Sequence, residues 1–414
     1  MRKNKPPLLA SRKHCTGCMA CVDSCRFGAL KGALRKDGHL YPVCDIRQCT
    51  GCGRCSKTCP VINGYDHGAA ECHSVPYAAW ANDDDLRMRS SSGGVFAAVA
   101  TKILQEGGYV AGAVMDGFDV RHRLIDRIED LSLLQGSKYQ QGDLTGIYRE
   151  VEQLLKMGRR VLFSGTGCQV GALHSYLGKR NYTGQLFTAD LICTGFPSIL
   201  PLRCFLKNEP HQIKALTYRD KLAGWYSNEQ KRITSQNISV LTETDQWIKY
   251  PSDIVYKAFS SHLLNRSSCL DCRFAKAHRK SDLTLADFWG DKDYPEEHYK
   301  GLSVVVTHSP AGEKLLKESD VTFHSIAWRK FLPFNFRMAN GRFRFLNFHP
   351  ARLWAPYLFA HCSYKTLKHL YNAVSPTPLW FPYYACGRVL SKMSRIGNKR
   401  KIDRIIHKLD KCRK

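Results

Sequence analysis

Short apolar runs alternate with helical patterns through the middle of the chain, from residue 77 to about residue 350. Two stretches predict helices, "GGVFAAVATKILQE" (93–106) and "QVGALHSYLG" (169–178). Five runs predict strands: "GYVAGAVM" (108–115), "RVLFSG" (160–165), "QLFTADLIC" (185–193), "DLTLADFW" (282–289) and "LSVVVTH" (302–308). Alternation of this kind favours an α/β core with a largely parallel sheet.

The two ends of the chain follow other patterns. In residues 1–65, "ALKGALRKDGHLYPV" places a Lys-Asp-Gly turn between short apolar pieces and predicts a hairpin. Residues 66–76 are Gly-rich and polar, as in a linker. Residues 351–414 form an aromatic and basic tail, whose end carries Ile402, Ile405, Ile406 and Leu409 at helical spacing. This predicts a basic helix, which either lies on a membrane surface or packs on its own domain or a partner.

Two runs of cysteine carry the strongest chemical signal. Both follow C-x-x-C-x-x-C-x-x-x-C, in "CTGCMACVDSC" and "CTGCGRCSKTCP". Three thiolates of one run face one cubane, and the fourth ligates the other cluster. The first set is therefore Cys15, Cys18, Cys21 and Cys59, and the second set is Cys25, Cys49, Cys52 and Cys55. The pattern resembles the bacterial two-cluster ferredoxin domain, an α+β fold with two 4Fe-4S clusters.

Two details leave alternatives open. "CDIRQCTGC" also reads as C-x4-C-x-x-C, so Cys44 is an alternative to Cys49, although Cys49 completes the regular pattern. Arg26 follows Cys25 where the ferredoxin family has proline, which loosens a turn without removing a ligand. Zinc is the other metal to weigh, but zinc sites use two pairs of ligands with longer gaps.

A further C-x-x-C pair, Cys269 and Cys272, lies in "RSSCLDCRF" and needs two more ligands. Cys168 follows one predicted strand and begins a helix, whose dipole favours a thiolate. Cys193 ends the next strand, so both lie at the edge where open α/β sheets build sites. These four cysteines form the core set and predict a third cluster. The alternative is that Cys168 and Cys193 are ordinary buried cysteines.

Two glycine-rich turns are candidates for binding phosphate. "GTGCQVG" is one residue away from the dinucleotide fingerprint and has no clear acidic partner, so it supports a nicotinamide cofactor weakly. "RSSSGGVFAAVA" (89–100) opens a predicted helix with hydroxyls and backbone N–H groups, which suit a phosphate. A plain serine N-cap is the alternative.

Six motifs occur in the order of the coenzyme F-420 hydrogenase/dehydrogenase beta-subunit family, which this chain resembles over residues 75 to 310. The motifs are "RSSSGGVFAAVA", "GSKYQQ", "GTGCQVGAL", "DLICTGFPS", "RSSCLDCRFA" and "RKSDLTLADFWG". The resemblance implies a flavoprotein that binds FAD beside a 4Fe-4S cluster held by the core set. It places the flavin on Ser91, Ser92, Gly93, Gly94, Ser137, Lys138 and Tyr139.

Individual residues of these motifs have competing interpretations. Lys138 either offsets the negative charge of the flavin or is a solvated loop lysine. Asp282, Asp287 and Trp289 of "SDLTLADFWG" have two interpretations. They either pack over the flavin or the cluster, or they belong to an ordinary core strand. In Gly165-Thr166-Gly167-Cys168 this chain lacks the proline that many family members have before the cysteine, which changes the turn without removing the Cys168 thiolate. No acid–base pair is recognisable, so the catalytic residues are unassigned.

Composition and charge indicate the cellular compartment and the kinds of partner. No apolar run reaches the roughly 18 residues of a membrane span, and the N-terminus lacks the apolar segment of a signal peptide. We therefore expect the reducing cytosol, where 18 cysteines indicate metal or redox chemistry. The net charge of +26 suits acidic electron-transfer proteins or, through the basic tail, the inner face of a membrane. No sequence motif supports specific nucleic-acid binding.

The sequence thus predicts an iron–sulfur flavoenzyme. Electrons would pass between a ferredoxin-like protein and a small organic acceptor through 4Fe-4S clusters and FAD. The predicted units are a two-cluster domain (1–65), a linker (66–76), an FAD and 4Fe-4S core (77–350) and the tail (351–414). The main alternative is a non-catalytic electron carrier that serves a separate enzyme, and a nucleic-acid-binding iron–sulfur protein rests on charge alone.

Overall fold

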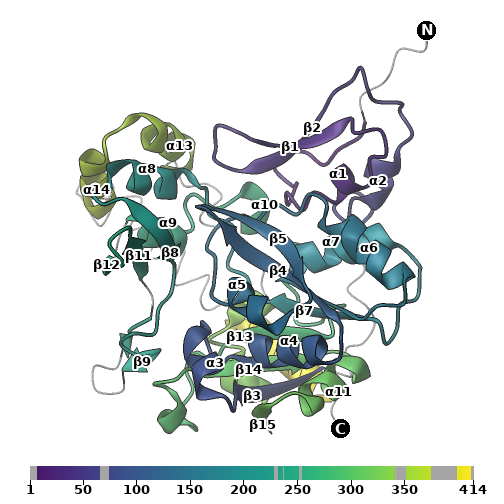
Figure 1. Cartoon of the computed structure of the whole chain (residues 1–414), viewed down its shortest axis with the longest axis vertical. Helices are drawn as coiled ribbons and strands as arrows, with labels where there is room; N and C mark the ends of the chain where they lie inside the picture. The colour runs from purple at the N-terminus through teal and green to yellow at the C-terminus, as the bar shows by residue number, and fades with distance from the viewer. Residues whose placement is uncertain are drawn as a thin grey trace.

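The computed structural model describes residues 7–65, 74–227, 232–235, 237–250, 254–339, 341, 351–373 and 399–411. A large sheet with helices on both faces forms the lower part of Figure 1. A small N-terminal unit, drawn in purple, lies above it at the upper right, and a second small unit lies at the upper left. All five strands and both helices that the hydrophobic pattern predicts for the core are present.

The large sheet is mixed rather than largely parallel, which corrects the expectation from sequence. Its strand order is β15-β3-β14-β13-β7-β6-β4-β5. The central pairs β4–β6, β6–β7 and β7–β13 are parallel, and the outer pairs are antiparallel. The strands are β3 (Val75–Ala81), β4 (Tyr109–Asp116), β5 (Asp119–Ile125), β6 (Val161–Thr166), β7 (Leu186–Leu191), β13 (Leu283–Asp287), β14 (Ser303–Thr307) and β15 (Val321–Ser325).

Helices cover both faces of this sheet. One face packs against α4 (Val95–Gln105), α5 (Leu131–Leu134) and α11 (Pro310–Glu318). The other face packs against α6 (Ile147–Lys156) and α7 (Gly167–Leu177). Shorter helical turns complete the unit: α3 (Asp84–Arg89), η1 (Ile128–Asp130), α10 (Ser267–Leu270), η2 (Pro295–Glu297), α12 (Trp328–Phe331) and η3 (Phe336–Met338). The sheet is therefore buried between two helical layers, as its continuous apolar strands require.

The N-terminal unit contains the predicted hairpin. Strands β1 (Leu30–Leu34) and β2 (Leu40–Cys44) pair antiparallel, and α1 (Ala20–Asp23) and α2 (Arg54–Thr58) lie beside them. Its own apolar cluster is small and includes Met19, Val22, Leu30 and Cys55. A unit with so little core needs help from metal or from neighbouring structure to be stable.

The second small unit was not apparent in the sequence. A three-stranded sheet, β8 (Ile213–Thr217), β11 (Ile238–Thr242) and β12 (Trp247–Tyr250), packs with α8 (Leu200–Asn208), α9 (Ile254–Ser261), α13 (Ala351–His361) and α14 (Tyr364–Ala373). A short strand pair, β9 (Tyr226–Ser227) and β10 (Arg232–Ile233), extends below it. Part of the expected tail, 351–373, therefore contributes to a core formed mainly by a much earlier part of the chain.

The end of the chain is helical, as expected, and residues 399–411 pack on the large sheet. Ile402, Ile406 and Leu409 are buried in one cluster with Trp328 and Phe331. The buried apolar face therefore favours the interpretation that this helix packs on its own domain. This face is not exposed to a lipid surface. No helix within the described ranges is long and apolar enough to cross a membrane.

Asp23 joins the N-terminal unit to the large sheet unit. Its carboxylate accepts hydrogen bonds from the backbone N–H of Gly146 (2.7 Å) and of Tyr148 (3.1 Å), at the start of α6. The helix has Gly146 at its N-cap and no capping side chain of its own. Asp23 therefore caps α6 from another unit of the chain.

We expect Asp23→Ala to destabilise the junction by about 1 kcal/mol, the usual value of a lost N-cap. For a chain of this size the midpoint of thermal unfolding falls by about 1–2 °C. The measurement is thermal unfolding of the anaerobic, cluster-containing protein. Asp23→Asn keeps an acceptor oxygen and is the matched control, with a smaller loss. An equal loss in both variants would assign the effect to charge rather than to capping.

Candidate functional site

The first set of cysteines surrounds a cavity in the N-terminal unit. Cys15, Cys18, Cys21 and Cys59 all line it, together with Leu9, Ala10, Thr16, Gly17, Met19, Pro42 and Val61. Burial raises the pKa of Cys18 to about 11, with a further rise from the neighbouring Cys15 thiol. Burial also raises the pKa of Cys21 and of Cys59 above the usual value. Four thiols from both runs of the motif thus meet around one space.

The second set lies beside it and includes an additional thiol. The Cys55 thiol interacts with those of Cys52 and Cys49. Cys44 hydrogen-bonds with Cys49 and also interacts with Cys55 and Cys25. Burial raises the pKa of Cys44 to about 11, and the hydrogen bond with Cys49 contributes to the same rise. Five thiols therefore gather at this end, and Cys44 remains the alternative to Cys49 that the sequence left open.

The core set comes together at the carboxyl ends of β6 and β7. Cys168 lies at the start of α7, directly after β6, and Cys193 follows β7 by two residues. The short helix α10 carries Cys269, and Cys272 follows it. The Cys168 thiol interacts with all three other thiols of the set. The fold thus brings together four residues that are separated by up to 104 positions in the chain.

A capping box fixes the turn that presents Cys168. Thr166 is the N-cap of α7, its side chain accepts from the backbone of Gln169, and the Gln169 side chain accepts from Thr166 N–H (2.8 Å). Thr166 therefore fixes the start of the helix that carries Cys168. Burial raises the pKa of Cys168 well above its usual value. The expected lowering by the helix dipole is outweighed by this burial.

Other groups in the core set interact directly with its sulfur atoms. The backbone N–H of Gly195 donates to Cys193 Sγ (3.3 Å), and that of Phe196 donates to Cys269 Sγ (3.4 Å). Burial raises the pKa of Cys193 to about 12. The buried Arg337 guanidinium donates to the Cys269 carbonyl (3.0 Å) and lies near the core thiols. N–H donors and a cation at sulfur stabilise the thiolate form that a metal requires.

The donor chemistry of all three sets fits iron–sulfur clusters. Each set is composed of soft sulfur ligands, which suit Fe–S clusters among the metals that proteins bind. Buried thiols with raised pKa values become thiolates when metal cations replace their protons. Within the described residues, no three His, Cys, Asp or Glu are arranged to hold a single metal ion. Thiolates on a cubane bind separate irons at its corners and are spaced more widely than around one ion.

The first set faces the core set through a hydrogen-bonded junction. Arg266 Nε donates to the Cys15 carbonyl (2.6 Å), and its Nη1 donates to the Leu40 carbonyl (2.9 Å) and to Gln141 Oε1 (2.8 Å). Arg266 is three residues before Cys269 and is fully buried. The side chain of Gln141 donates to the Gly17 carbonyl (3.0 Å). A single arginine therefore connects the loops of two cysteine sets.

Two further contacts cross this junction. The hydroxyl of the buried Tyr148 donates to the Cys18 carbonyl (2.8 Å). The Tyr148 phenol also interacts with the Cys168 thiol of the core set, and burial raises its pKa well above the usual value. Arg273, the residue after Cys272, donates to the Val61 carbonyl (3.2 Å), two residues after Cys59. The first and core sets thus share their immediate surroundings.

The two segments proposed for the flavin lie side by side. Ser91 Oγ accepts from the backbone N–H of Ser137 (2.6 Å) and from its hydroxyl (2.9 Å). Ser92 Oγ donates to the Leu302 carbonyl (2.9 Å), and Gly93 N–H donates to Ser303 Oγ (2.9 Å). Gly94 is the N-cap of α4, with no side-chain cap. The alternative of a plain serine N-cap is therefore wrong, and the serines instead join separate segments.

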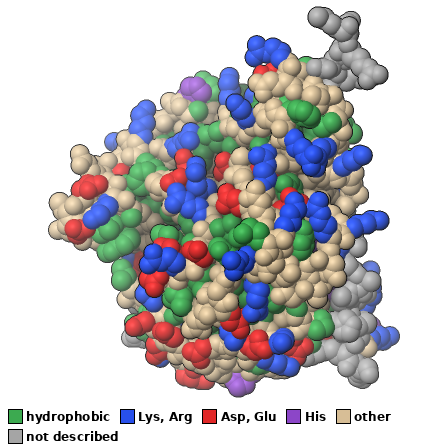
Figure 2. Space-filling view, turned by 45° about the vertical axis from the view of Figure 1, so that its right-hand side comes forward, with side chains coloured by type: hydrophobic (Ala, Val, Ile, Leu, Met, Phe, Trp, Pro, Cys, Tyr) green, Lys and Arg blue, Asp and Glu red, His purple; other side chains and the backbone are tan. Residues whose placement is uncertain are grey.

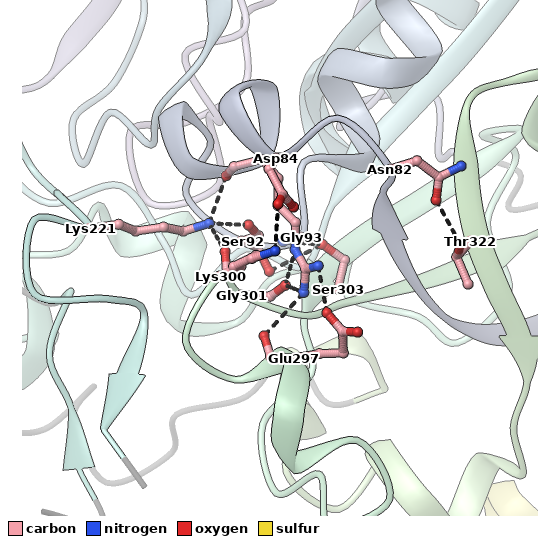
Figure 3. A network of polar contacts seen from close by, with 11 residues as sticks. Asn82, Asp84, Ser92, Gly93, Lys221, Glu297, Lys300, Gly301, Ser303 and Thr322 are labelled. Atoms are coloured by element: carbon pink, nitrogen blue, oxygen red, sulfur yellow. Dashed lines mark hydrogen bonds and ion pairs between the residues drawn. The ribbon is translucent and has the colours of Figure 1, made fainter. Parts of the chain in front are cut away.

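Two buried basic side chains, Lys221 and Arg87, hold the backbone around this Ser-Gly turn, and Figure 3 shows the Lys221 ammonium beside Ser92. Lys221 Nζ donates to the carbonyls of Ser92, Lys300 and Arg87. Arg87 donates to the Gly301 carbonyl (2.9 Å from Nε) and pairs with Glu297 (2.6 Å). Burial lowers the pKa of Lys221 to about 6, and the nearby Arg219 lowers it further in the same direction. The turn therefore has beside it the Arg87–Glu297 ion pair and a lysine whose charged form a nearby anion would favour.

Lys138 has a partner set that neither earlier interpretation named. Its ammonium donates to the carbonyls of Leu133 (3.1 Å), Leu134 (3.1 Å) and Gln135 (2.7 Å), at the end of α5. It is therefore a helix-terminating contact rather than a solvated loop lysine. Burial lowers its pKa to about 7. Its role toward a flavin stays a prediction.

An aromatic and charged group lies next to the flavin segments. Tyr139 stacks on Phe259 with ring centres 3.9 Å apart and hydrogen-bonds with Arg219. Arg219 pairs with Asp287 (2.9 Å), and Trp289 stacks on Trp225 (4.9 Å). Burial lowers the pKa of Arg219, but Asp287 and Tyr139 together outweigh it and raise the pKa above its usual value.

Asp282 of the same motif behaves as an ordinary core residue. It accepts from Thr188 N–H (2.8 Å) and from the Thr188 hydroxyl (2.9 Å), and the Ser309 hydroxyl donates to it (2.5 Å). For this residue the core-strand interpretation fits.

Four basic residues of these sites could not be found from the sequence, because an isolated Lys or Arg has no spacing pattern. They are Arg219, Lys221, Arg266 and Arg337.

The chain is similar to known families over most of its length. Two family models describe the beta subunit of coenzyme F420 hydrogenase/dehydrogenase: residues 76–147 match the model of its N-terminal part, and residues 158–323 match the model of its C terminus. Residues 14–63 match the 4Fe-4S dicluster domain. The two beta-subunit matches together cover more than half of the chain.

A solved structure is also similar to the chain. It is a chain of the F420-reducing [NiFe] hydrogenase complex from Methanosarcina barkeri, from a study of xenon derivatization. The match has 17% identity and a TM-score of 0.43, and it covers 64% of this chain and 87% of that one. Among curated proteins nothing matches.

We expect Cys44→Ser to leave the iron content unchanged, because Cys49 completes the regular motif of the second set. Cys49→Ser should lower iron, with a change in the EPR spectrum of the reduced protein. Both variants are compared by iron and acid-labile sulfide per chain after anaerobic purification. Loss of about four irons from Cys44→Ser alone would make Cys44 the ligand instead.

Cys269→Ser should lower iron by about four per chain if the core set holds a 4Fe-4S cluster. Cys204 is the matched control, since it is a buried cysteine in the core of the second small unit, away from all three sets. Cys204→Ser should keep the full iron content. Unchanged iron, sulfide and EPR signals in Cys269→Ser would refute the third cluster.

Proposed function

The chain belongs to the coenzyme F420 hydrogenase/dehydrogenase beta-subunit family and carries a 4Fe-4S dicluster domain, and from this premise we propose that it is an iron–sulfur flavoprotein oxidoreductase. It passes electrons between a ferredoxin-like protein and a small organic acceptor. The clusters are two in the N-terminal unit and one on the core set, and the flavin is FAD on the turn 91–94 and residues 137–139.

One observation carries this proposal: the first and core sets of thiols face each other across a buried junction. Arg266 bonds the Cys15 carbonyl and lies three residues before Cys269, and Arg273 bonds the Val61 carbonyl directly after Cys272. A junction of this kind keeps two redox groups at a fixed separation. A protein that only stored iron would have no need to hold its two sites in one rigid unit.

The flavin assignment is supported by where hydroxyls and cations lie. Ser91 and Ser137 meet by two hydrogen bonds, so segments separated by 46 residues form one polar surface. Lys221 and Arg87 lie beside it, and an anion bound there would favour the charged form of Lys221. Serine hydroxyls, backbone N–H groups and positive charge are the groups that bind the phosphates of a dinucleotide.

The residues of the chain have definable roles in such a reaction. A flavin, when bound, exchanges two electrons with an organic molecule and single electrons with clusters. Backbone N–H groups at Cys193 and Cys269 hold the sulfurs in place, and Arg337 offsets their negative charge. Tyr139, Trp289 and the Arg219–Asp287 pair line the region next to the serine turn. These residues would orient an aromatic ring system and exclude water from it.

The proposal is tested by iron, acid-labile sulfide and released flavin per chain in anaerobically purified protein. About twelve irons and one FAD are expected for three 4Fe-4S clusters and one flavin. Ser91→Ala should lower FAD affinity about tenfold, since it removes a hydrogen bond at a charged ligand. Ser132→Ala, an exposed serine nearby, is the matched control and should retain FAD.

Two results would change the assignment. About eight irons and no flavin after reconstitution would leave the N-terminal clusters alone. The chain would then be a carrier that passes electrons to a separate enzyme. Flavin present at one per chain but unaffected by Ser91→Ala would keep the flavoprotein and move its flavin away from the serine turn.

A further inference from the structure

We propose that electrons enter or leave through the second set, where a negatively charged one-electron carrier protein docks on an outer patch formed by Arg26, Phe27, Lys31, Ile46 and Arg47. The carrier is of the small acidic ferredoxin kind. This inference rests on the proposed function for its direction toward the core. The docking itself requires only the two clusters of the N-terminal unit.

The positions of the cysteine sets define an order. The carbonyls of Cys15, Gly17 and Cys18, in the loop of the first set, are bonded to side chains of the large sheet unit. Tyr148 interacts with thiols of both the first set and the core set. The first set is therefore the neighbour of the core set, and the second set is next along the chain of sites.

The second set lies toward solvent. Cys52 is exposed, whereas the four thiols of the core set are partly buried inside the molecule. A hydrogen bond from the backbone of Arg54 lowers the pKa of Cys52. The Cys25 carbonyl accepts from Arg149 (3.3 Å), at the exposed edge of the junction. A partner protein can therefore approach this set more closely than either of the others.

The outer patch is continuous with the second set through the hairpin. Leu30 pairs with Cys44 in the β1–β2 ladder, and Asp45 N–H donates to the Ala29 carbonyl (2.8 Å). This bond places the segment after Cys25 beside the segment after Cys44. Phe27 is 53% exposed and Ile46 is 50% exposed, although both are large and apolar. Two such residues next to a redox site form the apolar centre of a small contact surface.

Cations surround this apolar centre. Arg26 and Arg47 are exposed and adjoin Phe27 and Ile46 in sequence, and Arg47 also pairs with Asp45 (3.3 Å). The exposed Lys31 lies on the same hairpin, opposite Val43. Residues 7–65 contain nine Lys or Arg and three Asp, of which Asp23 is buried in the junction. In Figure 2, Lys and Arg side chains predominate toward the upper right, and Asp and Glu gather at the lower end. Such a surface steers an acidic protein toward the cluster.

An electron carrier fits this patch better than a nucleic acid or a membrane. Nucleic acid binding needs cations along a groove or helix, whereas these cations surround two apolar side chains beside an exposed cluster ligand. The apolar face of the helix 399–411 is buried in the core, so it does not anchor the chain to lipid next to this patch. A small and charged interface is typical of transient electron transfer.

The test measures the rate at which a reduced acidic two-cluster bacterial ferredoxin transfers electrons to the full, cluster-loaded chain, followed by stopped flow at low and high salt. The double variant Arg26→Glu with Lys31→Glu should lower the second-order rate constant by about tenfold or more at low salt. It should also weaken the decrease that salt causes in the unaltered protein. Phe27→Ser should lower the rate without changing the salt dependence.

The matched control is Lys314→Glu with Lys317→Glu, two exposed lysines on α11 at the opposite end of the molecule. Its net charge equals that of the test variant, so an equal loss of rate in both would overturn the patch. Reduction by dithionite should be the same in every variant, which shows that the clusters are intact. An unchanged rate in the test variant, or a patch-dependent binding of generic DNA or anionic vesicles in place of the ferredoxin, would also refute the proposal.

The result is separable from the proposed function. If the chain lacks flavin but shows the patch-dependent rate, the docking surface stands and the flavoenzyme does not. If flavin and iron are complete but the rate is insensitive to Arg26 and Lys31, the enzyme stands and its partner docks elsewhere.

Discussion

The arrangement of the first and core cysteine sets depends on the hydrogen bonds of one buried residue, Arg266. It is fully buried, its guanidinium lies 3.9 Å from the centre of the Tyr41 ring, and it bonds carbonyls of Cys15 and Leu40. A buried guanidinium is destabilising unless its donors find acceptors. Two of its acceptors, the Cys15 and Leu40 carbonyls, come from the N-terminal unit, while the arginine belongs to the segment that carries Cys269. Docking of the two units is therefore a condition for placing the core set beside the first set.

The same junction explains why the cluster loop has little freedom to change. Gly17 has a φ of +69°, and a Cβ at this position would collide with Gln141 and Arg266 and lie 2.8 Å from the Leu40 carbonyl. A side chain there would push the core residues away from the Cys15 loop. The glycine of C-x-G-C is thus required by the contact with the large sheet unit as well as by the turn around a cluster.

How far the sequence leads depends on whether a feature has a local pattern. The strands, the helices α4 and α7 and the hairpin were predictable, because apolar periodicity and turn residues are local. The mixed sheet was not, since β3 and β15 join its edge from distant segments. The second small unit escaped notice because α13 and α14 pack on α8 and α9 from a distant part of the chain. The cysteines of each set could be proposed from spacing and resemblance, whereas single cations such as Arg266 and Lys221 follow no spacing.

The pKa values of the buried thiols and of Lys221 indicate which protons would move when clusters and an anion bind. Burial raises the pKa of Cys18 in the first set, of Cys168 in the core set and of Cys55 in the second set, so these thiols favour the neutral form without metal. A bound cluster would replace the protons of its ligands and bring negative charge, and at the core set Arg337 and Arg266 lie where they would offset it. Lys221 is the counterpart at the serine turn, since burial lowers its pKa to about 6. An anion bound above that turn would restore its charged form, because an opposite charge nearby favours the ammonium. Binding of a cluster or of an anion at these places would therefore be coupled to the loss of protons from the thiols and the gain of a proton by the lysine.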